Sequence, residues 1–278
     1  MKILILGARG QLGSEFSLRL PDAVALGRDE CDVTDFDSVL DVFSSVKPGI
    51  VINCSAYNLV DRAEDEFWKA YAVNAVGAKN VACACRRFKA FMVHFSTDYV
   101  FDGEKEGLYV ETDRANPVNE YGKSKFAGER FVEGEIEDRL IFRVSWVYGR
   151  GKRNFVYKLI QWSENTETVR VSYDEFSIPT STSVIVDATL KALDLGLIGL
   201  YHLTCSGVAS RYEWAKKVFQ VLRIKKALVP VPSSVFNLAA ERPRFSAMSN
   251  NKLSKDLSLE LPYWEDELNR FLRFAQLF

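Results

Sequence analysis

A tyrosine and a lysine near the middle of the chain have the spacing needed to protonate a ketone during its reduction. Tyr121 and Lys125 are one turn apart in a predicted helix, so both side chains project from one face. A ketone that accepts a hydride also needs a proton on its oxygen, which a phenol can donate. A neighbouring ammonium favours this because it lowers the phenol's pKa from about 10. The same spacing also occurs on ordinary surface helices, so the pair needs support from its surroundings.

A hydroxyl side chain stands at the end of the predicted strand that precedes this helix. Thr97 follows an apolar run that ends at Phe95. Ligands bind at the carboxyl ends of parallel strands in α/β sheets. We therefore expect Thr97 to donate a hydrogen bond to the substrate carbonyl and to polarise it. Thr97, Tyr121 and Lys125 are the predicted catalytic group.

A glycine-rich turn near the N-terminus predicts a dinucleotide site. Gly7, Gly10 and Gly13 separate a hydrophobic strand from a predicted helix. In that context glycine lets the backbone approach a pyrophosphate, and the helix offers free N–H groups. An ordinary tight turn would carry the same glycines. The predicted cofactor is NADPH or NADH, and Tyr121 and Lys125 are expected to contact it.

The end of the second predicted strand favours NADPH over NADH. Arg28 stands where an acidic residue usually binds the ribose 2′-hydroxyl, and a guanidinium can pair with a 2′-phosphate instead. A solvated surface arginine would look the same in the sequence. Further along, Asp32 is a candidate acceptor for the exocyclic amine of adenine.

Histidines and cysteines give no metal or disulfide pattern. His94 and His202 lie in apolar stretches and are predicted core residues, so no metal site is expected. The number of cysteines is odd and their neighbours are mostly apolar, which is typical of free thiols in a reducing compartment. A cytoplasmic location is therefore expected. The cysteines are Cys31, Cys54, Cys83, Cys85 and Cys205.

Composition narrows the class of partner. The 278 residues include 36 basic and 37 acidic side chains, and the hydrophobic content of 47% is sufficient for a core. Balanced charge gives no electrostatic reason for binding nucleic acid or an anionic membrane. No apolar run approaches the ~18 residues of a transmembrane helix. We expect a small-molecule substrate, with neither nucleic acid nor membrane as a partner.

Short apolar runs alternate with amphipathic stretches in the first half of the chain. This alternation predicts an α/β fold, with a doubly wound parallel sheet of the Rossmann type covered on both faces. The predicted strands are 2–6, 23–26, 50–54, 90–95, 140–146 and 168–172. The predicted helices between them are 11–20, 36–46, 68–88 and 119–133.

Helical patterns dominate after about Gly151. They are predicted at 154–164, 183–195 and 212–222, followed by a proline-bearing connection at 230–232 and an amphipathic helix near 264–274. We therefore expect a dinucleotide-binding domain over residues 1–150. A smaller, mainly helical substrate-binding lobe is expected over residues 151–278, with one or two strands returning to the sheet.

These motifs resemble the extended short-chain dehydrogenases, and within them the dTDP-4-dehydrorhamnose reductases. The resemblance runs over nearly the whole chain. Its most specific segments are Ser-Thr-Asp-Tyr-Val-Phe at 96–101 and Ser-Trp-Val-Tyr at 145–148. Further matching segments are 53–57, 60–64, 117–125, 179–180 and 242–246.

The resemblance implies that the protein reduces the C4 ketone of dTDP-4-dehydro-L-rhamnose to give dTDP-L-rhamnose. It implies that Thr97, Tyr121 and Lys125 catalyse this step. Implied cofactor contacts are Gly10, Gln11, Leu12, Asp32, Val33, Ser55, Ala56 and Tyr57. Implied substrate contacts are Thr97, Asp98 and Trp146, with Arg242 as a candidate for the diphosphate.

Two positions depart from the family pattern. Ser177 stands where the family usually has glycine. Some members form a magnesium-bridged dimer through carboxylates, of which Glu15 matches one, whereas Ser183 stands at the place of a second. The expectation is therefore a monomer or a homodimer that needs no metal.

Other functions stay open from the sequence. A reductase, epimerase or dehydratase of another nucleotide sugar would share the scaffold. Dehydratases, however, place an Asp-Glu pair after the catalytic hydroxyl for acid–base elimination, whereas here Asp98 is followed by Tyr99. A non-catalytic regulatory subunit, like that of methionine adenosyltransferase, also resembles this family. The intact Thr97, Tyr121 and Lys125 favour an enzyme.

Overall fold

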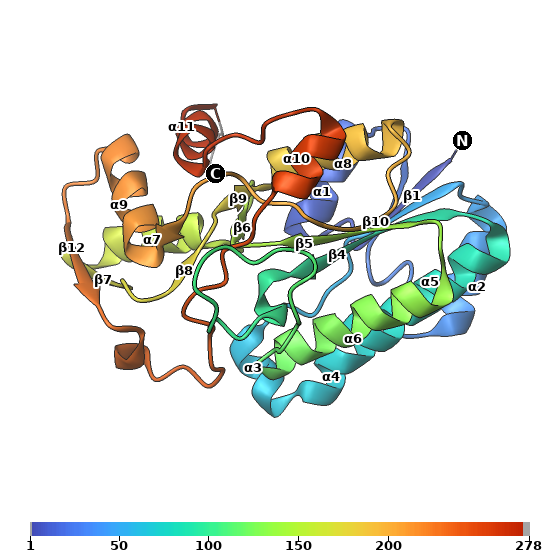
Figure 1. Cartoon of the computed structure of the whole chain (residues 1–278), viewed down its shortest axis with the longest axis horizontal. Coiled ribbons are helices and arrows are strands. Elements are labelled where there is room, and N and C mark those ends of the chain that lie inside the picture. The colour runs from blue at the N-terminus through green and yellow to red at the C-terminus, as the bar shows by residue number, and fades with distance from the viewer. Residues whose placement is uncertain (1, 275–278) are drawn as a thin grey trace.

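A six-stranded parallel sheet forms the centre of the protein, which we describe from a computed structural model over residues 2–274 (Figure 1). The strand order is β10-β5-β4-β3-β1-β2. The order in which successive strands are added to the sheet reverses between β1 and β3, which is where ligands bind in such sheets. The predicted Rossmann-type fold is confirmed. The strands are β1 Ile3–Leu6, β2 Val24–Leu26, β3 Ile50–Asn53, β4 Phe91–Thr97, β5 Arg139–Val144 and β10 Gly199–His202.

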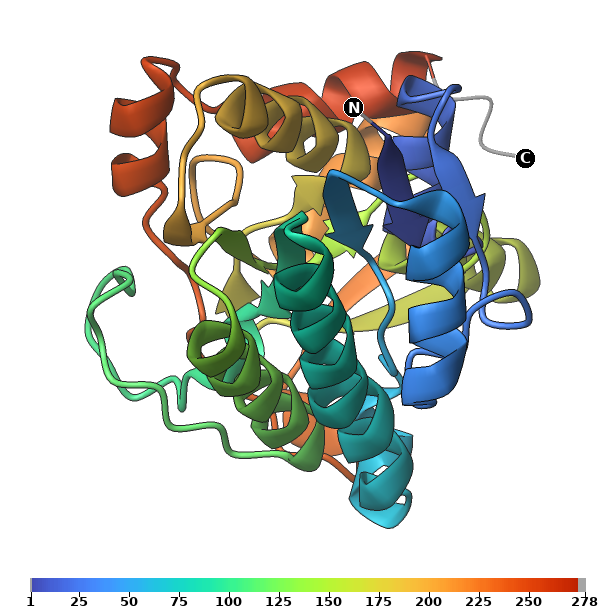
Figure 2. The same ribbon diagram turned by 90° about the vertical axis from the view of Figure 1, so that its right-hand side faces the viewer.

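Helices cover both faces of this sheet. Helices α2, α5 and α6 lie side by side on one face (Figures 1 and 2), and α1 and α8 pack against each other on the opposite face. Successive strand residues enter different cores: Met92 packs with the α5 side, whereas Val93 packs with the α1 side. Burial on both faces explains the continuous apolar strands. The helices are α1 Gln11–Arg19, α2 Phe36–Val46, α5 Ala78–Phe88, α6 Glu120–Glu135 and α8 Thr182–Asp194.

The prediction of one continuous helix at 68–88 is wrong, because a π-helical turn interrupts it. After α3 (Val60–Asp65), the chain forms α4 (Phe67–Tyr71), the π-turn Ala72–Gly77 and then α5. Asn74, only 1% exposed, lies in this turn. Such turns redirect side chains within a helix and frequently mark functional sites.

The second half of the chain also forms a small sheet of its own (Figure 1). Strand β7 (Thr168–Ser172) pairs in parallel with β12 (Ala227–Val231), apart from the six-stranded sheet. The predicted connection at 230–232 is therefore wrong for its first two residues, which lie in β12. Proline is tolerated there because an edge strand can leave one side unpaired. Helices α7 Phe155–Asn165, α9 Arg211–Leu222, α10 Asn251–Leu257 and α11 Trp264–Phe274 complete the second half.

Short strands connect this half of the chain to the ends of the main sheet. The pairs are β6 Val147–Tyr148 with β9 Thr180–Ser181, and β8 Phe176–Ser177 with β11 Ala209–Ser210. The other predicted helices and strands are confirmed, with ends shifted by a residue or two. Over residues 2–274, no helix combines the length and apolar character needed to cross a bilayer.

Both histidines are core residues, as predicted. His94 is 1% exposed, and its Nδ1 lies 3.4 Å from Asn53 Nδ2. His202 is fully buried, and its Nδ1 lies 3.2 Å from the Tyr109 carbonyl oxygen.

A buried ion pair joins α6 to the sheet. Arg143 of β5 donates to both carboxylate oxygens of Glu129, at 2.9 and 2.7 Å. Close approach of α6 to the π-turn depends on Gly128, because a Cβ there would lie 2.1 Å from the Asn74 carbonyl oxygen. The position of α6 on the sheet is thus fixed by both charge and shape.

Removing the cation of this pair should destabilise the fold strongly. In Arg143→Leu the Glu129 carboxylate would be left buried and unpaired, so we expect unfolding to become easier by about 3–5 kcal/mol. The matched control is Arg130→Leu, which breaks the exposed pair with Glu133 and should cost no more than about 1 kcal/mol. Urea unfolding measures both. Equal small losses would contradict the importance of the buried pair.

Candidate active site

The three predicted catalytic residues meet where β4 ends beside the start of α6. Thr97 is the last residue of β4 and is 6% exposed. Helix α6 begins here because the Asn119 side chain accepts the Gly122 N–H at 2.8 Å and caps it. The Thr97 hydroxyl interacts with the partly buried phenol of Tyr121. One turn on, Lys125 Nζ donates to the Phe95 carbonyl oxygen of β4 at 2.5 Å.

Burial dominates the electrostatics of this group. It raises the pKa of Tyr121; the Thr97 hydrogen bond opposes this effect, and the charge of Asp98 adds to it. The direction is opposite to the lowering expected from an adjacent ammonium. Burial also lowers the pKa of Lys125 to about 8, against the effect of Glu129. At neutral pH the phenol is therefore protonated and most of the lysine is charged.

The glycine turn has the shape required for a dinucleotide. Gly7 has φ of 74°, and Gly10 is the N-cap of α1 without a side-chain hydrogen bond, so the first N–H groups of α1 stay available. A Cβ at Gly13 would lie 2.3 Å from the Gly7 carbonyl oxygen, so only glycine fits there. Gln11 Nε2 donates to the Val147 carbonyl at 3.2 Å, whereas its buried Oε1 has no partner among the described residues. Next to it, Leu12 packs on the core.

Asn74 of the π-turn holds the loop after β3 against α6. Its amide accepts the Tyr57 N–H at 2.8 Å and donates to the Tyr57 carbonyl and the Ser124 hydroxyl, both at 2.9 Å. In the same loop the Ser55 N–H donates to Asn53 Oδ1, at the end of β3, at 3.1 Å. Ala56 is exposed. Our sequence analysis missed Asn74. The available signal was a polar residue among small and apolar residues of a predicted helix.

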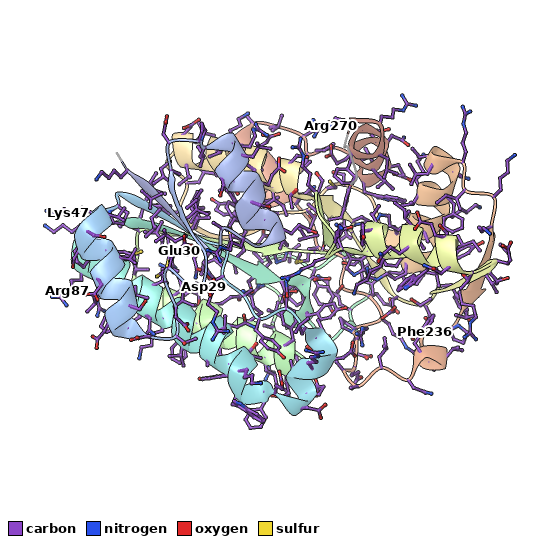
Figure 3. All side chains as sticks on the ribbon, turned by 180° about the vertical axis from the view of Figure 1, so that it is seen from behind. Asp29, Glu30, Lys47, Arg87, Phe236 and Arg270 are labelled. Atoms are coloured by element: carbon purple, nitrogen blue, oxygen red, sulfur yellow. The ribbon has the colours of Figure 1, made fainter. Side chains whose placement is uncertain are left out.

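Two guanidinium groups lie near the end of β2. Arg28 has a side chain 78% exposed, 3.4 Å from Asp32. Arg9 of the glycine turn lies beside the same segment and pairs with Asp29 at 2.6 Å; Figure 3 labels Asp29. Val33 is buried. The sequence analysis missed Arg9, although a basic residue inside the glycine turn was a usable signal.

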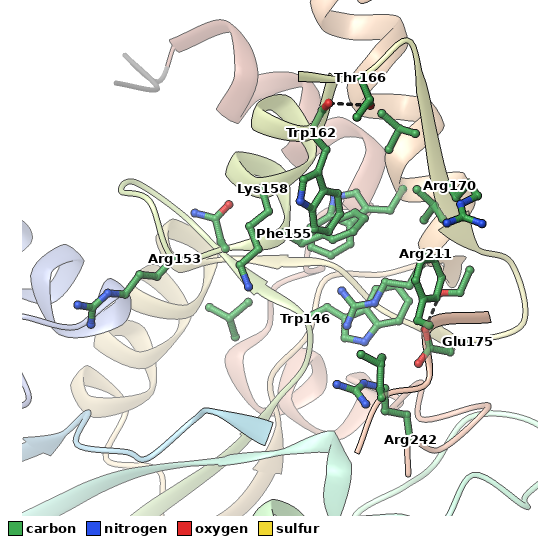
Figure 4. A pocket seen from close by; sticks show the side chains of 18 of the residues that line it. Trp146, Arg153, Phe155, Lys158, Trp162, Thr166, Arg170, Glu175, Arg211 and Arg242 are labelled. Carbon is green, nitrogen blue, oxygen red and sulfur yellow. Dashed lines mark hydrogen bonds between the residues drawn. The ribbon is translucent and has the colours of Figure 1, made fainter. Parts of the chain in front are cut away.

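A cavity of about 660 Å³ lies in the C-terminal lobe and reaches Trp146 and Val147, just after β5 (Figure 4). Its cationic lining residues are Arg153, Lys158, Arg170, Arg211 and Arg242, against the single carboxylate of Glu175. Its aromatic lining residues are Trp146, Phe155, Trp162, Trp214 and Phe236. Such a lining favours an anionic ligand that carries a ring.

Trp146 forms a rigid wall of this cavity. Its φ of 41° is uncommon for a bulky side chain, and such strain persists where the surroundings hold it. The ring stacks on Trp214 with centroids 5.6 Å apart. The Arg211 guanidinium lies 3.8 Å from the Trp146 ring centroid, and Figure 4 shows the two side by side.

Two predicted substrate contacts have protein partners. Arg242 lines the cavity while donating to both carboxylate oxygens of Asp61, at 3.0 and 2.7 Å. The Asp98 carboxyl is 2% exposed, and its Oδ2 accepts hydrogen bonds from Ser177 and Ser246 at 2.9 and 2.5 Å. Arg242 is thus held at the cavity, whereas Asp98 is enclosed by hydroxyl groups.

The positions related to the magnesium-bridged dimer carry other contacts. Glu15 is 8% exposed. Ser183 donates to Glu267 Oε1 at 2.9 Å, and the same carboxylate pairs with Arg270 at 2.7 Å. Over residues 2–274, no cluster of three histidine, cysteine, aspartate or glutamate side chains suits a metal ion.

The fold, the glycine turn and the Thr-Tyr-Lys group define a short-chain dehydrogenase/reductase. More narrowly, the chain belongs to the RmlD substrate binding domain family, which matches residues 1–276. It is 35% identical to a dTDP-4-dehydrorhamnose reductase of Burkholderia thailandensis, over 95% of each chain. The structure of a dTDP-4-dehydrorhamnose reductase of Clostridium acetobutylicum is similar with a TM-score of 0.96 at 35% identity, covering 99% of this chain and 100% of that one. The enzyme of the same name from Bacillus anthracis, in complex with NADP, gives 0.95 at 36% identity over 99% of each.

Burial of Lys125 should make the free energy of unfolding of the ligand-free protein change with pH in the alkaline range. Its pKa is about 8 in the folded protein and 10.5 without perturbation, so between these values the unfolded chain binds more protons. The free energy of unfolding that depends on Lys125 should therefore rise with pH across this window. Urea unfolding should show this rise relative to Lys125→Met. Lys123→Met, at an exposed lysine, should follow the wild type. A pH-independent difference between wild type and Lys125→Met would contradict the shift.

Proposed function

We propose that the chain reduces the C4 ketone of dTDP-4-dehydro-L-rhamnose with NADPH, giving dTDP-L-rhamnose. The observation that carries the proposal is the meeting of Thr97, Tyr121 and Lys125 at the carboxyl edge of the sheet. The names of the similar enzymes support the sugar nucleotide, and the NADP complex of the Bacillus anthracis enzyme supports the cofactor.

The cofactor supplies the hydride when bound. The free N–H groups of α1 suit a pyrophosphate, and the unpaired Gln11 Oε1 offers an acceptor. Arg9 and Arg28 place cations where a 2′-phosphate would be recognised. The further cofactor contacts that we propose are Gly7, Gly10, Leu12, Gly13, Asp32, Val33, Ser55, Ala56, Tyr57, Tyr121 and Lys125.

The cavity in the C-terminal lobe is the proposed place for the nucleoside diphosphate. Its excess of cationic side chains would attract the diphosphate, and its aromatic walls suit the base. Arg242 is a proposed diphosphate contact because Asp61 holds it at the cavity. Trp146 lines the cavity and follows the end of β5 by two residues, so it would meet the sugar.

Tyr121 is the proposed proton donor. Its raised pKa keeps the phenol protonated, and an alkoxide formed by hydride addition is a stronger base than a phenolate. Proton transfer to the sugar oxygen is therefore favourable. The Lys125 ammonium would stabilise the phenolate that remains, and Thr97 would hydrogen-bond the carbonyl oxygen.

We also propose a cytoplasmic location, because all five cysteines are free thiols. A monomer or a homodimer without metal is the proposed assembly. It is supported by Ser183, whose neighbouring carboxylate on Glu267 is already paired with Arg270.

Cofactor choice should depend on Arg28. In Arg28→Ala the KM for NADPH should rise roughly tenfold, since one charge-assisted contact is lost, whereas the KM for NADH should hardly change. Steady-state kinetics with both cofactors measures this. Arg87→Ala, an exposed arginine on α5, is the control and should change neither. Equal increases for both cofactors would refute recognition of the 2′-phosphate.

Loss of the proton donor should stop turnover without preventing binding. Tyr121→Phe keeps the ring but should lower kcat by roughly 10²–10⁴, as for a lost general acid. Thr97→Val should lower kcat by less, and Lys125→Met should also weaken NADPH binding. Loss of absorbance at the nicotinamide band follows turnover, and Tyr263→Phe, at an exposed tyrosine, should behave as wild type. Near-normal turnover of Tyr121→Phe would reopen the regulatory and dehydratase alternatives.

The assembly should be insensitive to magnesium. Sedimentation of the purified protein should give the same mass with magnesium and with a chelator, because Ser183 cannot replace a carboxylate ligand. A halving of the mass on chelation would show that a metal bridges two copies.

A further inference from the structure

Asp98 joins the two halves of the molecule through hydroxyl groups. Its Oδ1 lies 3.1 Å from the Thr97 hydroxyl oxygen. Its Oδ2 accepts from Ser177 of β8 at 2.9 Å and from Ser246 at 2.5 Å. Asp98 is 2% exposed, and the two serines are 0% and 1% exposed. The carboxyl is enclosed by protein, and Thr97 is the catalytic residue that it contacts directly.

The number of hydrogens limits what Thr97 can do. A threonine hydroxyl has one hydrogen to donate and two lone pairs that accept. One lone pair accepts the Tyr99 N–H at 3.2 Å. If Asp98 is a carboxylate it can only accept, and a Thr97 hydrogen that points to Asp98 is then not available to the Tyr121 phenol or to a ketone. If Oδ1 carries a proton, Asp98 donates to Thr97, whose own hydrogen is then free.

Burial and the polar neighbours of Asp98 act on its pKa in opposite directions, and burial has the larger effect. Burial raises the pKa of Asp98, whereas the hydrogen bonds from Ser246, Ser177 and Thr97, together with the charge of Arg211, lower it. The Arg211 guanidinium lies over the Trp146 ring. The other titratable groups that face Asp98 are the phenols of Tyr99 and Tyr121, which burial keeps neutral.

We propose that Asp98 carries a proton on Oδ1 in the reactive enzyme and donates it as a hydrogen bond to Thr97, so that the Thr97 hydrogen points to the ketone oxygen. Asp98 is then a positioning residue, and Ser177 and Ser246 fix its other oxygen. Thr97 accepts two hydrogen bonds in this arrangement, which makes it a stronger donor. This inference rests on the proposed reductase function.

Asparagine at this position distinguishes the two protonation states. In Asp98→Asn the amide can donate to Thr97, and its oxygen can accept from both serines, as the protonated acid does. The variant should keep kcat within about threefold, whereas losing a carbonyl hydrogen bond costs about 10²–10³. Wild-type kcat should fall as rising pH ionises Asp98, whereas the variant should keep only the fall near pH 8 that follows from Lys125. Thr97→Val should lower kcat equally in both backgrounds.

The opposite results would overturn the proposal. A loss of about a hundredfold in Asp98→Asn, with the melting temperature and NADPH affinity of the wild type, would show that the carboxylate is required. An alkaline limb in the variant identical to that of the wild type would show that ionisation of Asp98 does not control turnover.

Infrared spectroscopy separates this inference from the reductase function, because it needs no turnover. The carbonyl stretch of a protonated carboxylic acid should be present in the wild type at neutral pH and absent in Asp98→Asn. Should that variant fail to fold, the band is titrated in the wild type and in Ser177→Ala, where loss of a donor should move it to higher pH. A wild type that shows the band but reduces no ketone would refute the reductase alone. Active wild type without the band would refute only the proton on Asp98.

Discussion

The contact of α6 with the sheet decides where chemistry can occur in this protein. Glu129 pairs with Arg143 of β5, and one turn earlier Lys125 donates to the Phe95 carbonyl of β4. One further turn brings Tyr121 to the end of β4. All three contacts require the same register between helix and sheet. Sliding α6 by one turn would leave a buried carboxylate and a buried ammonium without partners, which is far more costly than rearranging apolar contacts.

The same arrangement buries the charged ammonium of Lys125, which packing alone would not favour. Burial lowers the pKa of Lys125, so keeping its ammonium charged inside the folded protein costs stability. A neutral residue would pack there at lower cost. Strained or costly groups of this kind are expected at functional sites, where local rules are broken for a purpose. Trp146 at the cavity wall is a second costly residue of this kind, because its backbone has a positive φ.

Features with a local cause could be predicted from the sequence. The strand before Gly7, the glycine turn and the helical spacing of Tyr121 and Lys125 each depend on neighbouring residues, and the structure has them as expected. The connection predicted around Pro230 was wrong because proline disfavours strands in general. The edge strand β12 nevertheless accepts it. The π-turn around Asn74 was not predicted, because one residue inserted into a helix hardly changes its pattern of apolar side chains.

Contacts between distant segments could not be predicted. Asp61 and Arg242 are far apart in sequence, and only the folded chain shows that this guanidinium is held by a carboxylate. Likewise, the sequence placed Asp98 after a catalytic hydroxyl but could not show the serines that enclose it. The pKa of Tyr121 was expected to fall because Lys125 is its helical neighbour. Burial raises it instead, and burial is a property of the whole fold.

The most direct test of the central claim follows the hydride itself. The protein is incubated with dTDP-4-dehydro-L-rhamnose and NADPH that carries deuterium at the transferable position of nicotinamide C4, and the sugar is examined by NMR. The account predicts one deuterium at C4 of the product, with dTDP-L-rhamnose formed in step with NADPH consumed. Binding of both molecules without transfer of deuterium to C4 would contradict it.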